Sequence, residues 1–192
     1  MSSAAEPTFE QLIDAVFDPL FGYALRMAGN RPDAEDLLQE SIYRALRGFR
    51  GFRPGTNFKA WMFRIVTNTF ISRKRSERRA PQALSSPEEV VERPAPGEAA
   101  LADPLDTQAW DELLGQALSD EVRQALLDLP EDFRAPLLLF CVGELRYREI
   151  AEALDLPVGT VMSRLFRARQ RMRASLEEHA RTRGVPLAEE AL

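Results

Sequence analysis

The stretch Tyr147–Met172, YREIAEALDLPVGTVMSRLFRARQRM, decides the predicted fold of the second half of the chain. Its pattern is that of a helix-turn-helix: a short apolar-faced helix, a tight turn at Asp155–Gly159 and a longer helix from Thr160 to about Glu178. The small side chain of Ala151 lies where the two helices are expected to cross closely. Four apolar side chains form the predicted buried contact between them: Ile150, Leu156, Val161 and Leu165.

The longer helix keeps a second face that these contacts leave free. In a helix-turn-helix, the N-terminal part of this helix reaches base edges in the major groove of DNA. Arginine donates two hydrogen bonds to guanine, whereas serine more often holds a phosphate. The sequence therefore favours a duplex-reading helix over the alternative, a helical hairpin with solvated arginines. The predicted reading face consists of Met162, Ser163, Phe166, Arg167 and Arg169, with Arg164 beside it.

A second amphipathic stretch, Asn57–Arg79, reads NFKAWMFRIVTNTFISRKRSERR. Asn57 suits a helix cap, because its side-chain oxygen accepts an N–H of the first turn. Apolar residues then recur at helical spacing, polar residues fall on another face, and the helix runs into a basic end. By itself this pattern is equally consistent with an ordinary amphipathic helix and with a surface that binds nucleic acid through phosphate contacts and base stacking.

Two further helices are predicted before this stretch. The first runs from Thr8 to about Met27, and Pro19 is expected to bend or divide it. The second covers residues 32–49, and its first-turn acids suit the positive end of a helix. Its predicted inward side chains are Leu37, Leu38, Ile42, Ala45 and Leu46. The helix dipole is a weaker explanation for three polar residues that lie further along, Asp36, Gln39 and Glu40.

Prolines and acids dominate the segment that separates the two helical units. Five prolines interrupt any helix over residues 80–106, and six acids keep that stretch solvated. We therefore expect an all-α fold of two small helical domains, over residues 1–79 and 119–183. An acidic, proline-rich flexible linker joins them over residues 80–118, and residues 184–192 form a tail.

The charge distribution is more informative than the net charge of −5. Residues 44–79 contain eleven Lys or Arg and one acid, and residues 164–183 contain seven arginines and two acids. Two basic blocks separated by an acidic segment indicate two separate contacts with an anionic polymer.

Catalysis and membrane insertion find little support in the sequence. The chain has one cysteine and one histidine, so a zinc site with the usual ligands is not predicted, and neither is a disulfide. It lacks the glycine-rich phosphate-binding loops and the GxSxG motif, and no apolar run approaches the length of a membrane span. We expect a cytoplasmic protein that is not an enzyme and has no cofactor or metal.

Three stretches together resemble bacterial sigma factors of the sigma-70 superfamily, extracytoplasmic-function (ECF) type. Residues 33–46, DAEDLLQESIYRAL, look like the helix with which the family binds core RNA polymerase. Residues 55–75, GTNFKAWMFRIVTNTFISRKR, look like the segment that binds the −10 promoter element. Residues 129–140, LPEDFRAPLLLF, with the opening stretch look like the domain that reads the −35 element.

The resemblance implies roles for individual residues. Asp36, Gln39 and Glu40 would contact the clamp coiled coil of the largest subunit of core RNA polymerase. The −10 element would be bound and opened by Phe58, Lys59, Trp61, Arg64, Asn68, Ser72, Arg73 and Arg75. The −35 element of promoter DNA would be held or read by Arg146, Thr160, Met162, Ser163, Arg164, Phe166 and Arg167.

Two positions depart from the family pattern, and the resemblance also suggests a regulator. Many relatives have Asp or Asn where Ser72 stands and Lys or Arg where Met162 stands, so base preference at both positions is open. The family commonly has an anti-sigma factor as inhibitory partner, which is expected here by resemblance. The alternative function is an autonomous helix-turn-helix regulator that binds paired half-sites as a dimer.

Overall fold

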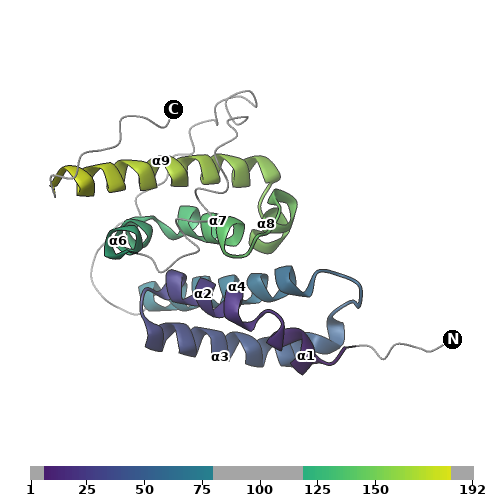
Figure 1. The fold of residues 1–192 in the computed structure, drawn as a ribbon. Helices are drawn as coiled ribbons and strands as arrows, with labels where there is room; N and C mark the ends of the chain where they lie inside the picture. The colour runs from purple at the N-terminus through teal and green to yellow at the C-terminus, as the bar shows by residue number, and fades with distance from the viewer. Residues whose placement is uncertain (1–6, 80–118, 183–192) are drawn as a thin grey trace.

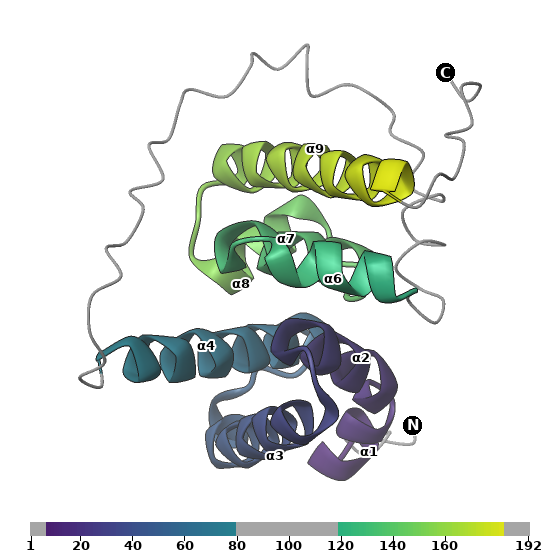
Figure 2. The same ribbon diagram turned by 90° about the vertical axis from the view of Figure 1, so that its left-hand side faces the viewer.

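The computed structural model describes residues 7–79 and 119–182, and the predicted linker and tail lie outside these residues. Within them every regular element is helical, which confirms the predicted all-α class. Figures 1 and 2 show two helical groups, one above the other. The first group consists of α1 (Phe9–Asp14), α2 (Phe17–Ala28), α3 (Arg31–Gly48), a 3₁₀ turn η1 (Phe49–Gly51) and α4 (Phe58–Arg79). The second consists of α6 (Asp120–Asp128), α7 (Glu131–Cys141), α8 (Tyr147–Leu154) and α9 (Val158–Thr182).

The single first helix predicted from the sequence is divided into α1 and α2. The Thr8 side chain caps α1 in a capping box with Gln11, and the helix ends at Ala15. The break precedes Pro19, which falls in the first turn of α2, where a missing N–H costs no helical hydrogen bond. Pro19 therefore lies in the first turn of a separate helix and does not bend a continuous one.

Gly29 joins α2 to α3 in the left-handed region, with φ of +86°. This conformation favours glycine, because a Cβ atom would crowd the following backbone. A Cβ at this position would also lie 2.9 Å from the Leu127 side chain of α6 in the second group. Asn30 then caps α3 by accepting the N–H of Asp33. The glycine thus serves the turn and the close approach of the two groups.

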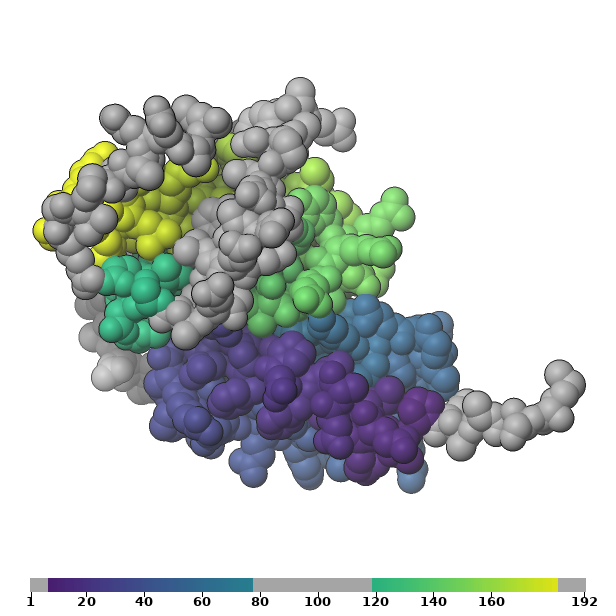
Figure 3. Space-filling view, viewed as in Figure 1, coloured from purple at the N-terminus to yellow at the C-terminus, as the bar shows by residue number. Residues whose placement is uncertain are grey.

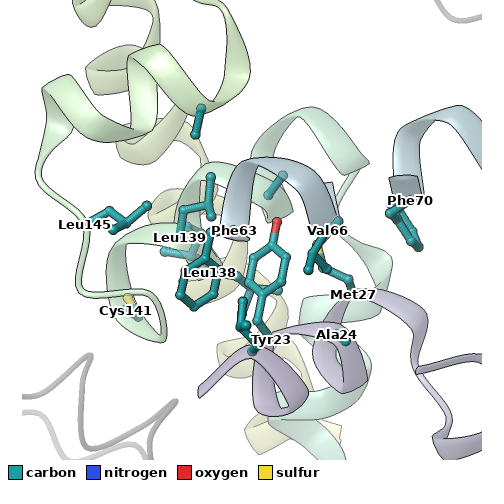
Figure 4. Packing of buried hydrophobic residues seen from close by; sticks show 14 of the residues in the cluster. Tyr23, Ala24, Met27, Phe63, Val66, Phe70, Leu138, Leu139, Cys141 and Leu145 are labelled. Carbon is teal, nitrogen blue, oxygen red and sulfur yellow. The ribbon is translucent and has the colours of Figure 1, made fainter. Parts of the chain in front are cut away.

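The core of the first group forms where α2 and α4 cross. Tyr23, Met27, Phe63 and Val66 are at most 1% exposed and pack together, as Figure 4 shows. The Tyr23 hydroxyl lies 2.7 Å from the Thr67 hydroxyl, and both residues are fully buried. The face of α4 that contacts α2 is therefore fixed by apolar packing and by a buried polar pair.

Aromatic rings enclose the start of α4. Phe58 packs edge-to-face against Phe9 and Phe52, with ring centroids 6.0 and 5.4 Å apart. Trp61 lies 5.1 Å from the Phe52 ring and 6.5 Å from that of Phe49. These contacts fold the glycine-rich loop between α3 and α4 over the first turn of α4 and hold that turn in place.

The second group contains the predicted helix-turn-helix, formed by α8 and α9. Ile150, Val161 and Leu165 are at most 2% exposed, and Ala151 is buried where the helices approach, which confirms the predicted contact. Asp155 ends α8 in the left-handed region with φ of +55°, a conformation that Asp tolerates better than most residues. α9 begins at Val158, two residues earlier than predicted.

Helix α7 lies between the two groups. Four consecutive residues, Pro136–Leu139, are buried, although successive side chains of a helix point 100° apart. Burial on every side requires neighbours on every side, and α7 contacts α8 and α9 in its own group and α2 in the other. Figure 3 shows the two groups touching along a continuous boundary.

Three polar contacts also cross this boundary. Buried Arg134 donates from one terminal nitrogen to the Met27 carbonyl at 3.3 Å. The Asn57 amide donates to Glu149 Oε1 at 2.6 Å, and Lys59 Nζ lies 2.7 Å from Glu144 Oε2. In the described part of the chain, no helix is both long enough and apolar enough to span a bilayer.

Candidate nucleic-acid interface

The outer side of α4 brings together four of the residues predicted to bind the −10 element. Arg64, Asn68, Ser72 and Arg75 are all exposed and follow one another at intervals of four, four and three residues. Residues spaced in this way lie above one another on a helix surface. They form a single stripe, which we call the α4 stripe, with a guanidinium near each end and two short polar side chains between them.

The other predicted −10 residues lie beside the α4 stripe or beneath it. Trp61 is partly buried in the aromatic cluster. Lys59 is also partly buried, and its ammonium group pairs with Glu144 of the second group. Phe58 is only 7% exposed and its ring belongs to the core. The structure therefore offers the Phe58 ring as a support for the N-terminal turn of α4, not as an exposed stacking surface.

Arg73 points away from the α4 stripe and toward α3. Its Nε atom donates to Glu40 Oε2 at 2.6 Å, and one terminal nitrogen donates to the Asp36 carbonyl at 2.9 Å. Sequence reasoning assigned Arg73 to promoter DNA and both α3 residues to the polymerase. The structure joins the two predicted sites through this side chain.

On the α3 face Asp36 and Gln39 are exposed to solvent, whereas Glu40 is partly covered. Arg44 holds the other carboxylate oxygen of Glu40 at 2.5 Å. Burial by itself would raise the pKa of Glu40, but the hydrogen bonds and charges of Arg73 and Arg44 outweigh it, and the pKa lies below its usual value. The Glu40 carboxylate is therefore ionised and oriented at neutral pH.

Two apolar side chains continue this face, and sequence reasoning missed both. Tyr43 is 60% exposed and Leu46 is 51% exposed, so the prediction that Leu46 is buried was wrong. The inward positions of α3 are Ala34, Leu37, Leu38, Ser41 and Ala45. Leu46 lies about 100° around the helix from Ala45, which turns it outward. The seven-residue interval from Asp36 to Tyr43 was the available signal, because it places both on one face.

The second predicted DNA surface includes the first half of α9. Val161 and Leu165 face inward, while Thr160, Met162, Ser163, Phe166 and Arg167 are partly exposed. The Ser163 hydroxyl donates to the Thr160 carbonyl at 3.0 Å. Arg164 is 22% exposed and lies 3.3 Å from Asp132 of α7. The surface is therefore partly ordered by contacts within its own domain before any DNA is present.

Arg146 stands at the N-cap of α8, where it is exposed. Its backbone N–H donates to Glu149 Oε2 at 2.8 Å, so Glu149 caps the first turn of α8 and also accepts a hydrogen bond from Asn57. Further along α9, the guanidinium of Arg169 lies over the Phe140 ring at 5.1 Å, and that of Arg171 over Phe133 at 4.7 Å. These two arginines contribute to packing against α7 as well as to the positive charge of α9.

Catalytic or metal chemistry gains no support from the geometry. The described ranges 7–79 and 119–182 contain no group of three His, Cys, Asp or Glu side chains that could hold a metal ion. Cys141 is buried at the end of α7. The surfaces that the structure does assemble are cationic, polar or apolar and are suited to contact with macromolecules.

Both helical groups match family models. The sigma-70 region 2 model matches residues 12–80, and the sigma-70 region 4 model matches residues 119–172. The relatives are named as ECF RNA polymerase sigma factors. SigW of Bacillus subtilis is 30% identical over 180 residues, which cover 90% of this chain and 91% of that protein. SigE of Mycolicibacterium smegmatis is 36% identical over 178 residues, and the chain spans 65% of its length.

Solved structures show the same fold. The sigma factor RpoE from Bartonella quintana, solved in complex with the anti-sigma factor NepR, matches with a TM-score of 0.65. It is 24% identical, and the match covers 88% of this chain and 96% of that one. CnrH, in complex with the cytosolic domain of CnrY, is 23% identical and has a TM-score of 0.59, with 88% of each chain covered. Two family models in order and relatives matched over most of their length identify the chain as a member of the ECF sigma factors of the sigma-70 superfamily, which are transcription initiation factors.

Proposed function

We propose that the protein directs core RNA polymerase to promoters by using the α4 stripe to hold the opened −10 element and the α9 face to hold the −35 duplex. Lys59 and Trp61 extend the −10 surface, and Phe58 supports it from beneath. The protein has no reaction of its own in this scheme, and its partners are the polymerase and promoter DNA.

The α4 stripe is the observation on which this proposal chiefly rests. Opening a duplex requires unstacked bases to be captured, and unstacking costs a few kcal/mol per base. Exposed Asn68 and Ser72 offer hydrogen-bonding groups to a base edge, and Arg64 and Arg75 offer charge to the phosphates on either side. Trp61 at the end of the aromatic cluster provides a ring for stacking.

The α9 face suits a duplex. The second helix of a helix-turn-helix enters the major groove with its N-terminal residues, which here include Thr160, Ser163 and Arg164. Arg167 is positioned one turn beyond Ser163 and is proposed to reach a guanine, whereas Arg146 is proposed to hold a phosphate. Met162 and Phe166 are apolar and suit contact with a thymine methyl group.

The α3 face is proposed to bind the clamp coiled coil of the largest polymerase subunit. Asp36, Gln39 and Glu40 offer acceptors, and exposed Tyr43 and Leu46 offer apolar surface on the following turns. Aromatic and apolar residues beside a polar rim are characteristic of protein interfaces. This face lies on α3, apart from the α4 stripe, so the protein can bind the polymerase and the −10 strand at the same time.

An anti-sigma factor is proposed as a further partner, and a cytoplasmic location follows from the polymerase partner. RpoE, which has this fold, was crystallised with the anti-sigma factor NepR, and CnrH was solved with the cytosolic domain of CnrY, which supports a protein partner of that kind. Lys59 and Asn57 bond to Glu144 and Glu149 in this structure, so the −10 strand must replace those carboxylates when it binds.

A mobility-shift assay on a promoter duplex, with and without core polymerase, tests the proposed function. The full chain is expected to shift the duplex only in the presence of polymerase, and Asp36→Arg is expected to abolish that shift without changing the fold. Tight, specific binding by the free protein would instead support an autonomous helix-turn-helix regulator. Normal co-purification of Asp36→Arg with the polymerase would refute the α3 interface.

A further inference from the structure

Arg73 connects the helix proposed to grip the −10 strand with the helix proposed to bind the polymerase. Its guanidinium contacts the Glu40 carboxylate through two nitrogens, Nε at 2.6 Å and a terminal nitrogen at 2.5 Å. The same terminal nitrogen donates to the Asp36 carbonyl at 2.9 Å. The arginine fork contacts the two acceptors through two nitrogens in a fixed planar geometry, whereas a lysine ammonium offers a single nitrogen.

Arg73 does not belong to the α4 stripe. It follows Ser72 by one residue, which turns its side chain about 100° around the helix, away from the exposed polar groups. Its side chain is 32% exposed and partly covered, whereas the stripe residues, including Arg75 two positions later, are exposed. The direction of the side chain therefore favours a role toward α3 over a contact with DNA.

Glu40 needs such a support to keep one orientation. A glutamate on a helix surface has several rotamers, and fixing them costs conformational entropy that a partner must otherwise overcome on binding. Arg44 lies one turn away on the same helix and holds Oε1, but its own side chain is 49% exposed. Arg73 approaches from another helix and holds Oε2, which ties the carboxylate to the scaffold of the domain.

We propose that Arg73 is a positioning residue of the polymerase-binding face, which it serves by fixing Glu40 and the adjoining turn of α3, rather than a DNA contact. This inference rests on the proposed polymerase interface. Arg73 preorganises Glu40, so the polymerase meets an acceptor that is already oriented, and Arg44, the more exposed of the two cations, is the one that exchanges with a polymerase cation.

A double-mutant cycle on the full chain tests the inference. The dissociation constant for core polymerase is measured without promoter DNA for the parent protein, Arg73→Ala, Glu40→Gln and the double variant. We expect each single variant to weaken binding by about threefold to tenfold, so that a double variant little worse than one of them gives a coupling typical of residues in direct contact. The double variant is expected to bind only slightly more weakly than Glu40→Gln, because Arg73 acts at this face chiefly through the carboxylate and only in small part through the Asp36 carbonyl.

Three further variants sharpen the result. Arg73→Lys is expected to restore part of the affinity, because it retains one of the two contacts. Arg123→Ala removes another ion-paired arginine, which is 48% exposed and pairs with Asp120 in the second domain, and it controls for the loss of one paired surface charge. The free energy of unfolding is measured for every variant, so that lost affinity is separated from lost fold.

Two outcomes overturn the inference. If the loss of affinity in the double variant equals the product of the two single losses, Arg73 and Glu40 act independently. Unchanged polymerase affinity for Arg73→Ala, combined with weaker −10 opening by the assembled holoenzyme, would make Arg73 a DNA contact. Asp36→Arg distinguishes these from a failure of the proposed function: if it too binds polymerase normally, the α3 interface itself is wrong, and the inference falls with it.

Discussion

The hydroxyl pair between Tyr23 and Thr67 has a definite direction, which leads to an unequal effect of removing each partner. The Thr67 hydroxyl donates its single hydrogen to the Phe63 carbonyl at 2.7 Å. The Tyr23 hydroxyl, 2.7 Å from Thr67 Oγ1, must therefore be the donor in that contact. Burial raises the pKa of Tyr23 well above its usual value, so the phenol keeps its proton at any ordinary pH.

The expected losses follow from what each change leaves behind. Tyr23→Phe removes a donor, while the Thr67 hydroxyl keeps its bond to the backbone, and we expect a loss of about 0.5–1.5 kcal/mol. Thr67→Val keeps the shape but leaves the phenol hydroxyl fully buried without an acceptor, which costs about 1–3 kcal/mol. The double variant has no stranded group, so its loss is expected to fall well below the sum of the two.

Urea unfolding of the full chain, followed by circular dichroism, measures these losses. Tyr43→Phe is the matched control, because Tyr43 is 60% exposed and losing its hydroxyl is expected to change stability by less than about 0.5 kcal/mol. A larger loss for Tyr23→Phe than for Thr67→Val would refute the assigned direction of the hydrogen bond. A loss of stability in the double variant that equals the sum of the two single losses would refute the contact itself.

Three other changes test the boundary between the domains and the α9 face. Arg134 is buried, its Nε atom has no hydrogen-bond partner, and burial lowers its pKa. Because a buried charge is costly, Arg134→Met is expected to raise the free energy of unfolding by about 1 kcal/mol or more, as measured by urea unfolding. A loss would show that its bond to the Met27 carbonyl outweighs the cost of burying the charge. Glu144→Lys is expected to cost less than about 1 kcal/mol in the same assay despite its short contact with Lys59, because Glu144 is 76% exposed. Arg167→Ala is expected to weaken use of the −35 element by about 1–3 kcal/mol, measured as transcription from promoters with altered −35 sequences. A loss that is equal for all of those sequences would identify a phosphate contact.

The helix-turn-helix was predictable because its determinants lie close together in the sequence. Turn residues between two apolar faces determine the crossing of α8 and α9, and Ile150, Val161 and Leu165 are buried as expected. The α4 stripe was predictable for the same reason, since helical spacing alone brings Arg64 and Asn68 to one face. Periodicity of this kind needs no knowledge of the neighbouring elements.

Errors arose where burial depends on neighbours from elsewhere in the chain. Ser41 is fully buried on α3, because its hydroxyl donates a hydrogen bond to the Leu37 carbonyl. With its polar group satisfied in this way, Ser41 can occupy the inward face of the helix. Leu46 is turned outward although it is the more apolar residue. Phe58 enters the core because the loop aromatics Phe49 and Phe52 fold over it, and helical spacing does not reveal that cover.

Contacts across the domain boundary join residues about 85 to 107 positions apart, and no local pattern predicts them. These contacts differ in how much they stabilise the boundary. Glu144 and Asn57 are exposed, so the two ionic or polar contacts to α4 exchange readily with water and salt. The α7 side chains that meet α2 are buried, and separating them returns apolar surface to water at about 25 cal/mol per Å².

Salt and a binding partner should therefore act differently on this boundary. Salt screens the ion pair of Lys59, and a kosmotropic salt also strengthens apolar association, so raising the concentration of such a salt should release the Lys59 side chain without separating the domains. A partner that presents its own apolar surface to α7 or α2 replaces the lost burial and separates the domains at little net cost. Releasing Lys59 and Asn57 from the second domain thus requires only the small ionic and polar part, which DNA phosphates can replace, whereas separating the domains also requires the larger apolar part, which needs a protein.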